Sequence, residues 1–184
     1  MIPLTKQRKY SIKTERLGIR NWLPSDIEPF SEMGQDVEVM KYFPELRSKE
    51  DSKNFIARMQ NHFETYGFCY FAMDVLETGE FIGFTGILNQ NYESKFTPCV
   101  DIGWRLKKSA WGNGFATEAA KACLDFAFSK LNLNEIYSFA TITNKGSEAI
   151  MKKIGMNHID TFNHPSLINH KELERCLVYK INKK

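Results

Sequence analysis

Two long segments of the chain carry hydrophobic residues at helical spacing. Over residues 116–131, small and aliphatic side chains recur every three or four positions, which predicts an amphipathic helix able to lie close against a sheet. Aromatic and aliphatic residues recur in the same way after Ser48, and Gly67 can end that helix in the left-handed conformation. These two segments are the clearest helix predictions in the chain.

Two shorter helices are predicted at residues 26–33 and 147–154. Ser25 followed three residues later by Glu28 has the pattern of a capping box, in which each side chain accepts a hydrogen bond from the backbone of the other. Gly155 is placed to end the later helix.

Strand patterns fill most of the remaining chain, because β-branched and aromatic residues there alternate with polar ones or form short apolar runs. The turn at residues 77–80 predicts a hairpin. The predicted strands are 17–22, 68–75, 81–88, 100–106, 136–143, 157–162 and 175–181. This order of elements predicts a single α+β domain over residues 1–184 with one mixed sheet.

The composition is that of an ordinary globular domain. The 184 residues are 42% hydrophobic and 26% charged, with a formal net charge of +3. We expect no membrane contact, because no apolar run reaches about 18 residues. Residues 1–9 are polar and basic, so we expect no secretory signal and a cytoplasmic location. Basic residues form no stripe, which argues against a nucleic-acid partner, while the slight positive excess suits a small polyanion.

Cysteines and histidines give no sign of a metal site. The four cysteines are scattered without a C-x-x-C pair, and the four histidines form no H-x-x-x-H or H-E-x-x-H pattern. We therefore expect no metal, and buried reduced thiols rather than disulfides at Cys69, Cys99, Cys123 and Cys176.

A glycine-rich turn precedes the clearest helix. Gly112 and Gly114 lie just before residues 116–131, where the unpaired N–H groups of a first helical turn attract anions. Because glycine has no Cβ, a phosphate can approach the backbone there. A Rossmann turn needs G-x-G-x-x-G early in a β-α-β unit, and a Walker loop needs G-K-S/T. This turn therefore matches neither nucleotide-binding motif well. A purely structural turn remains the alternative.

Seven segments, in this order, resemble the GCN5-related N-acetyltransferases (GNAT), and more narrowly the branch that contains the ribosomal-protein N-terminal acetyltransferases. The resemblance implies a mostly antiparallel seven-stranded sheet with a splayed parallel strand pair and about four flanking helices. It also implies acetyl-CoA as co-substrate. The segments that carry it are 14–20, 81–83, 101–106, 111–119, 144–147, 151–156 and 162–165.

The resemblance implies where acetyl-CoA binds. The pantetheine arm would enter between the splayed strands 100–106 and 136–143 and pair with backbone groups that the splay leaves unpaired. The pyrophosphate would bind at the glycine turn. The residues implied to bind the cofactor are Trp104, Arg105, Leu106, Gly112, Asn113, Gly114, Phe115, Ala116, Thr117, Asn144 and Lys153.

Two residues are candidates for proton transfer. Asp101 occupies the strand position at which this branch often has a glutamate, so we predict it as the general base, directly or through a water. A structural carboxylate is the alternative. Many relatives carry a tyrosine seven residues after the asparagine, where this chain has Met151, and the narrower branch implies Ser147 as the substitute acid. Ser147 could equally cap a helix.

The resulting hypothesis is an enzyme that transfers the acetyl group of acetyl-CoA to a primary amine by direct attack in a ternary complex. The amine would belong to a protein N-terminus or a small molecule. The alternative, which Ser109 and Met151 favour as departures from the family pattern, is a non-catalytic acyl-CoA-binding module on the same fold. Tyr92, Glu93 and His164 are looser candidates around the acceptor cleft, and a monomer or homodimer is expected.

Overall fold

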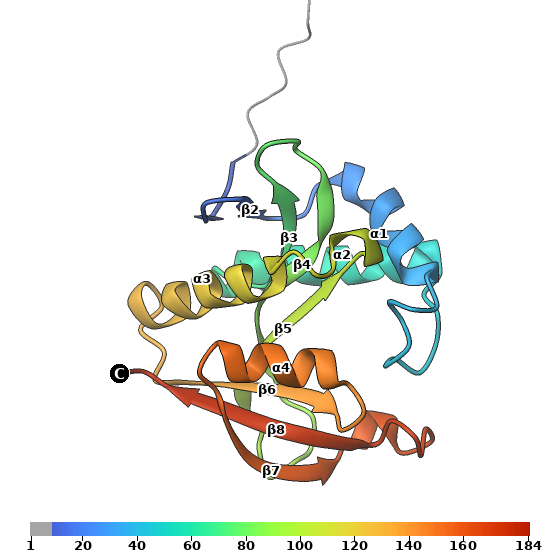
Figure 1. Ribbon diagram of the computed structural model, residues 1–184, viewed down its shortest axis with the longest axis vertical. Helices are drawn as coiled ribbons and strands as arrows, with labels where there is room; N and C mark the ends of the chain where they lie inside the picture. Colours follow the sequence, from blue (N-terminus) through green and yellow to red (C-terminus); the bar gives the residue numbers. More distant parts are fainter. Residues whose placement is uncertain (1–8) are drawn as a thin grey trace, which may run out of the picture.

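The computed structural model describes residues 9–184, which fold around one eight-stranded sheet with the order β1-β2-β3-β4-β5-β6-β8-β7. All neighbouring strands in it are antiparallel except β5 and β6, which are parallel. Figure 1 shows α3 and α4 on the near face of the sheet and α2 on its far face. Residues 1–8, on which the expectation of no secretory signal largely rests, lie outside the described residues.

Every predicted helix and strand is present, with ends displaced by one or a few residues. The helices are α1 (Ile27–Gln35), α2 (Lys49–Tyr66), α3 (Phe115–Ser129) and α4 (Lys145–Lys153). The strands are β1 (Ile12–Lys13), β2 (Leu17–Arg20), β3 (Tyr70–Val75), β4 (Phe81–Gln90), β5 (Cys99–Leu106), β6 (Glu135–Thr141), β7 (Asn157–Asn163) and β8 (Arg175–Asn182). The predicted mixed α+β fold is confirmed. The sheet has one strand more than predicted, because the two residues of β1 are too few to show a pattern.

The two clearest helix predictions are confirmed by their packing and their caps. Ala119, Ala120 and Ala127 of α3 are fully buried, and the helix lies against β4 and β5. The small side chains allow this close approach. Helix α2 begins after Ser48, whose side chain accepts from the backbone N–H of Asp51, and Gly67 ends it with a φ of 77°.

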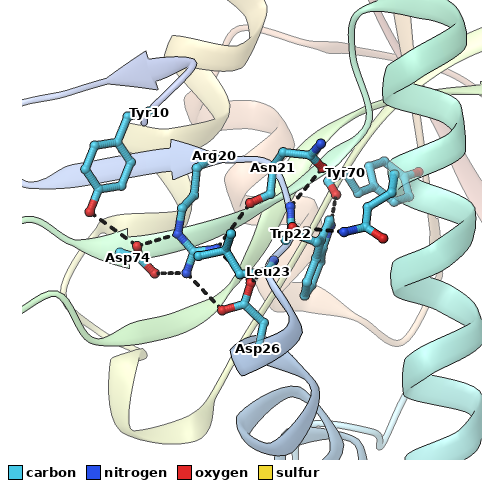
Figure 2. Close-up of polar contacts among 9 residues, drawn as sticks. Tyr10, Arg20, Asn21, Trp22, Leu23, Asp26, Tyr70 and Asp74 are labelled. Carbon is cyan, nitrogen blue, oxygen red and sulfur yellow. Dashed lines mark hydrogen bonds and ion pairs between the residues drawn. The ribbon is translucent and has the colours of Figure 1, made fainter. Parts of the chain in front are cut away.

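A buried arginine ties the first strands together (Figure 2). Arg20 of β2 is 1% exposed and donates to both oxygens of Asp74 on β3 (2.7 and 2.8 Å) and of Asp26 (2.7 and 2.9 Å). Burial opposes the charge on the guanidinium, but the hydrogen bonds to both carboxylates outweigh it and raise the pKa of Arg20. Beside this network, Trp22 Nε1 donates to the Tyr70 carbonyl (2.6 Å) and fixes the start of β3.

The same network explains why the predicted capping box at the first helix is wrong. Asp26, rather than Ser25, accepts a backbone hydrogen bond there, from the N–H of Leu23 (2.8 Å). A short 3-10 helix at Pro24–Asp26 therefore precedes α1. The Asp26 carboxylate also accepts from Arg20, and this second contact further fixes Asp26 at the start of the helix. Glu28 instead forms an exposed ion pair with Lys49 of α2.

All four cysteines are free thiols. Cys69, Cys123 and Cys176 are buried and Cys99 is partly buried. None of the helices in residues 9–184 combines the length and the apolar character needed to cross a lipid bilayer.

Candidate active site

A cavity of 930 Å³ opens where β5 and β6 separate. Its walls come from β5, β6, the starts of α3 and α4, and the connection between α1 and α2. Of the residues predicted for the cofactor and the chemistry, all but Asn113 line it. The structure thus brings together residues that are up to 52 positions apart in the chain, from Asp101 to Lys153.

The opening exists because the two parallel strands meet at one place. Their backbone pairing has a single register, Asp101 with Tyr137. Just beyond it, the hydroxyl of Ser138 donates to the carbonyl of Ile102 (3.0 Å), and both groups are buried. Past this point β5 continues to Leu106 with β4 on one side and no paired strand on the other. This is the geometry that the splayed-strand prediction requires.

The glycine turn lies at the far end of the cavity. Gly112 and Gly114 both have a φ of 78°, a conformation that favours glycine, and Gly114 is the N-cap of α3. No side chain caps this helix, so the backbone N–H groups of its first turn remain available. A Cβ at Gly112 would meet nothing within 4 Å. The side chain of Asn113 is turned to the carbonyls of Ala110 (3.3 Å) and Trp111 (3.1 Å), where it stabilises the turn.

An arginine from the chain's first segment clamps the glycine turn. Arg16 Nη1 donates to the Asn113 carbonyl (3.0 Å), and its guanidinium forms an ion pair with Glu118 of α3 (2.5 Å) and lies over the ring of Phe115 (4.7 Å). Thr14 donates to the same carboxylate (2.5 Å). Burial opposes ionisation of Glu118, but the hydrogen bonds from Thr14 and Arg16 outweigh it and lower its pKa. Glu118 therefore stays ionised, and the positive charge of Arg16 offsets its negative charge beside the turn.

Asp101 is a buried carboxylate with one strong hydrogen bond. It is 7% exposed, and the hydroxyl of Tyr70 on β3 donates to its Oδ1 (2.6 Å). Burial raises the pKa of Asp101 to about 6, and the hydrogen bond from Tyr70 limits the rise. A carboxyl with a pKa near neutrality is suited to exchange protons at the working pH. The pair with Tyr70 agrees with a structural role for Asp101, and its position in the cavity wall is compatible with the predicted base, which stays a prediction.

The start of α4 faces the cavity from the other strand. Asn144 is the N-cap, and its Oδ1 accepts from the backbone N–H of Ser147 (3.0 Å). The alternative interpretation of Ser147 as the cap is therefore wrong. The Ser147 hydroxyl has no hydrogen-bond partner within residues 9–184, while Met151 is fully buried. Ser147 is the hydroxyl available at this end of the cavity, and Lys153 lies at its exposed rim.

Aromatic residues form the end of the cavity beyond Asp101. The rings of Tyr92 and His164 lie 4.4 Å apart, and both line the cavity, whereas Glu93 does not. The Tyr92 hydroxyl is buried and makes no hydrogen bond within the described part of the chain. Burial lowers the pKa of His164, and its Nδ1 accepts from the Ser166 N–H (3.2 Å), so the ring is uncharged at neutral pH.

The family comparison agrees with this geometry. Residues 16–157 match the family model described as the acetyltransferase (GNAT) domain. The chain belongs to the GNAT acetyltransferase family. It is also similar to the uncharacterized N-acetyltransferase YnaD of Bacillus subtilis, with 32% identity over 147 residues that cover 79% of this chain and 81% of the relative.

Solved structures of GNAT proteins have the same fold. A GNAT acetyltransferase from Bacillus anthracis superposes with a TM-score of 0.77 and 28% identity, covering 94% of this chain and 98% of that one. Spermidine N-acetyltransferase from Vibrio cholerae, in complex with CoA and spermine, has a TM-score of 0.72 at 16% identity, over 92% of this chain and 97% of that one. As a GNAT member, the chain is an acetyl-CoA-dependent acetyltransferase.

Sequence reasoning missed three residues that shape the site. Tyr70 binds Asp101 only because the register of β3, β4 and β5 aligns them, and no local pattern reveals that register. Arg16 was part of a family segment, but its partner Glu118 is 102 positions away. Arg105 was predicted for its backbone alone. Its side chain could have been placed on the face of Asp101 from the two-residue period of a strand.

Proposed function

We propose that this chain is a single N-acetyltransferase domain that transfers the acetyl group of acetyl-CoA to a primary amine by direct attack in a ternary complex. The observation that carries the proposal is the position of Asp101, a buried carboxylate at the point where the parallel strands separate. The glycine turn at the other end of the same cavity supports a donor held by its pyrophosphate.

Three features of the cavity support acetyl-CoA as the donor that it would bind. The unpaired edge of β5 at Trp104–Leu106 offers backbone donors and acceptors to the amides of the pantetheine arm. The uncapped N–H groups from Gly114 to Thr117 would bind the pyrophosphate, and the open space at Gly112 leaves room for it. The Nδ2 of Asn144 donates to no group in residues 9–184 and could bind the cofactor, while its Oδ1 caps the helix.

The proton transfers follow from the groups around the separation point. A primary amine is protonated at neutral pH, so Asp101 accepts one proton, directly or through a water, and exposes the lone pair. The nitrogen then forms a bond to the acetyl carbon as the carbon–sulfur bond breaks. The thiolate leaves with the electron pair and takes a proton from the Ser147 hydroxyl, which lines the same cavity. The acylated nitrogen loses its second proton, which passes through water to the Ser147 oxygen and restores the hydroxyl. The products are an N-acetylated amine and free CoA.

The cofactor assignment is tested by a matched pair of glycine substitutions. Gly114→Ala and Gly67→Ala both place a Cβ on a residue with a φ close to 77°, so they strain the backbone equally. Only Gly114 lines the cavity. We expect Gly114→Ala to weaken CoA binding by at least about tenfold, because a Cβ displaces phosphate from the backbone, and Gly67→Ala to leave it unchanged. Equal affinities in both variants would refute the assignment.

The reaction is tested by release of free thiol from acetyl-CoA over a panel of peptides, amino acids and polyamines. We expect amine-dependent release that Asp101→Asn slows by about a hundredfold or more, since general base catalysis contributes on that scale. CoA binding without release over any amine would favour a non-catalytic module instead.

A further inference from the structure

Arg105 sends its side chain to the acceptor side of the sheet. Along β5 the side chains alternate, so Asp101, Gly103 and Arg105 share a face. Contacts with one layer of rings confirm this placement. Tyr70 binds Asp101 and stacks on Phe84 (5.5 Å between ring centroids), and the guanidinium of Arg105 lies over Phe84 (5.2 Å). Asp101 and Arg105 are thus two ends of one surface inside the cavity.

No carboxylate of the described residues neutralises Arg105. Its guanidinium lies among the rings of Phe30 (5.3 Å), Phe43 (4.9 Å) and Phe84, and its Nη1 reaches only the sulfur of Met40 (2.9 Å). The Nε is buried and makes no hydrogen bond to any group in residues 9–184. Burial lowers the pKa of Arg105 to about 10.

The contrast with Arg20 shows what Arg105 lacks. Arg20 is fully buried and makes four hydrogen bonds to two carboxylates, whereas Arg105 is partly buried and makes no hydrogen bond to a carboxylate of the described residues. A buried charge without a partner is costly, and an unsatisfied buried donor adds to the cost. An anion that bound Arg105 would supply the missing partner. Arg105 lines the cavity, where an anion from solution can reach it.

A second arginine reinforces the positive charge. Arg47, just before α2, lines the same cavity, and its charge repels that of Arg105. Its side chain forms no ion pair with the described residues. Among the described residues, the carboxylates that line the cavity are Asp101 and Glu38, and neither forms an ion pair with an arginine. The two arginines thus line the cavity without a carboxylate partner in residues 9–184, and the buried Asp101 lies at the point where β5 and β6 separate.

We propose that Arg105 and Arg47 bind a carboxylate of the acceptor, so that the acceptor is a primary amine that also carries a carboxylate, as amino acids and peptides do. The proposal rests on the proposed function, because it takes the amine to lie near Asp101. The planar fork of an arginine matches a carboxylate in two parallel hydrogen bonds. The Cα atoms of Asp101 and Arg105 are about 13 Å apart along the strand, which leaves several bonds between amine and carboxylate.

A polycationic acceptor fits this surface poorly. A polyamine would place a second ammonium group near Arg105 and Arg47, and like charges in a desolvated cleft repel strongly. The expected order of acceptors is therefore amino carboxylates first, neutral amines next and spermidine last.

The test compares ligands that differ in one charge. Binding to the CoA-loaded protein is measured by calorimetry for ω-amino acids from β-alanine to 6-aminohexanoate and for the amides of the same acids. Dipeptides are compared with their C-terminal amides in the same way. We expect the free acid to bind at least about tenfold more tightly than its amide for the best-fitting length, the range of a hydrogen bond to a charged group.

Three variants assign the effect to the two arginines. Arg105→Met keeps an unbranched apolar stem among the rings, and Arg47→Gln changes the residue outside the aromatic cage. Each should bring the ratio of acid to amide affinity close to one. Arg58→Gln is the matched control, because Arg58 also lies over a ring, that of Phe55 (5.5 Å), but is exposed on α2 and does not line the cavity. It should preserve the ratio.

Several outcomes would overturn the proposal. Equal affinity for acids and amides in the unchanged protein would do so, as would no binding of any acid at tens of millimolar. A preserved ratio in both folded variants would remove the arginines from acceptor binding. Tighter binding of 2-aminoethylphosphonate than of β-alanine would replace the carboxylate with a phosphoryl group. Because binding is read without turnover, it is independent of thiol release, whose absence counts against the proposed function alone.

Discussion

Two opposing effects set the proton affinity of Asp101, the candidate base, and one of them comes from Tyr70. Withdrawal from water raises the pKa of the carboxyl to about 6, and the Tyr70 hydroxyl donates to its charged form and restrains that rise. The pair also raises the pKa of Tyr70 well above its usual value, through burial first and the nearby carboxylate second. Tyr70 therefore remains a donor over the whole range in which Asp101 titrates.

Removing the Tyr70 hydroxyl should shift the pH dependence of the reaction. Asp101 accepts a proton only when it is ionised, so kcat/KM should rise with pH through about 6 in the unchanged protein. In Tyr70→Phe the charged form loses the larger of its two side-chain donors, Tyr70 rather than Gln90, so the pKa of Asp101 rises and the acid limb moves to higher pH. Tyr66→Phe is the control, since Tyr66 is 53% exposed on α2. An acid limb that stays in place in Tyr70→Phe would contradict this assignment.

At the same scale, the sequence indicated the site residues better than their partners. Asp101, Asn144 and the two glycines could be chosen from local patterns and family resemblance, and all line one cavity. Their hydrogen-bond partners could not be chosen, because such pairs depend on strand register. The cap of α4 illustrates this limit: Ser147 and Asn144 both suit an N-cap, and only the structure shows that Asn144 occupies it.

Among the elements, the first turn of α3 combines an anion site with an acidic residue. The helix start attracts phosphate, but Glu118 lies within that first turn and would repel it. Arg16 resolves the conflict by pairing with Glu118 while holding the turn through the Asn113 carbonyl. The loop before β2 and the start of α3 therefore act together at the cofactor end of the cavity.

Breaking this clamp should weaken CoA binding through charge. In Arg16→Met the Glu118 carboxylate loses its partner beside the phosphates, and we expect the Kd of CoA to rise about five- to tenfold at low salt. Glu118→Gln in the same background should recover most of the loss, and added salt should reduce it. Titration of the single and double variants measures this. If the double variant binds as weakly as Arg16→Met, the clamp acts through turn geometry instead.

Helix ends were predictable where one residue alone suited the position. Helix α2 begins after Ser48 and ends at Gly67 as expected, because no tertiary contact displaces either residue from its capping position. Ser25 and Glu28 had an equally good capping pattern. In the structure, however, Asp26 accepts from both Arg20 and the Leu23 N–H, so Asp26 rather than Ser25 caps the segment before α1. A tertiary ion pair thus overrode a local capping preference, and no pattern within the segment could reveal it.

For the whole molecule, the pattern of apolar residues was enough to predict the elements but not their neighbours. Each strand except the two-residue β1 was visible as an apolar or alternating run. The position of β8 between β6 and β7 was not, because it depends on which edge the last strand joins. Family resemblance supplied the parallel pair, and the structure located its one point of contact at Asp101 and Tyr137.

Binding of CoA in the cavity should slow amide hydrogen exchange on both of the strands that separate there, β5 and β6. A bound pantetheine arm would pair with β5 and cover β6, so CoA should slow amide hydrogen exchange at residues 104–106 and 139–141. Helix α2, on the far face, should change far less (Figure 1). Exchange followed by mass spectrometry with and without CoA measures this. Protection confined to the start of α3 would mean that the splayed strands do not hold the arm.

The single register between β5 and β6 also bears on how long the protein lasts in a cell. It divides the sheet into two antiparallel halves, β1–β5 and β6–β8, that share little backbone pairing. A ligand that contacts both halves stabilises the folded state by an amount that grows with the logarithm of its concentration, about 2.7 kcal/mol at a hundred times its Kd. Proteases act on opened molecules. We therefore expect the lifetime of the protein to follow the supply of acetyl-CoA, so that its abundance falls when this metabolite is scarce.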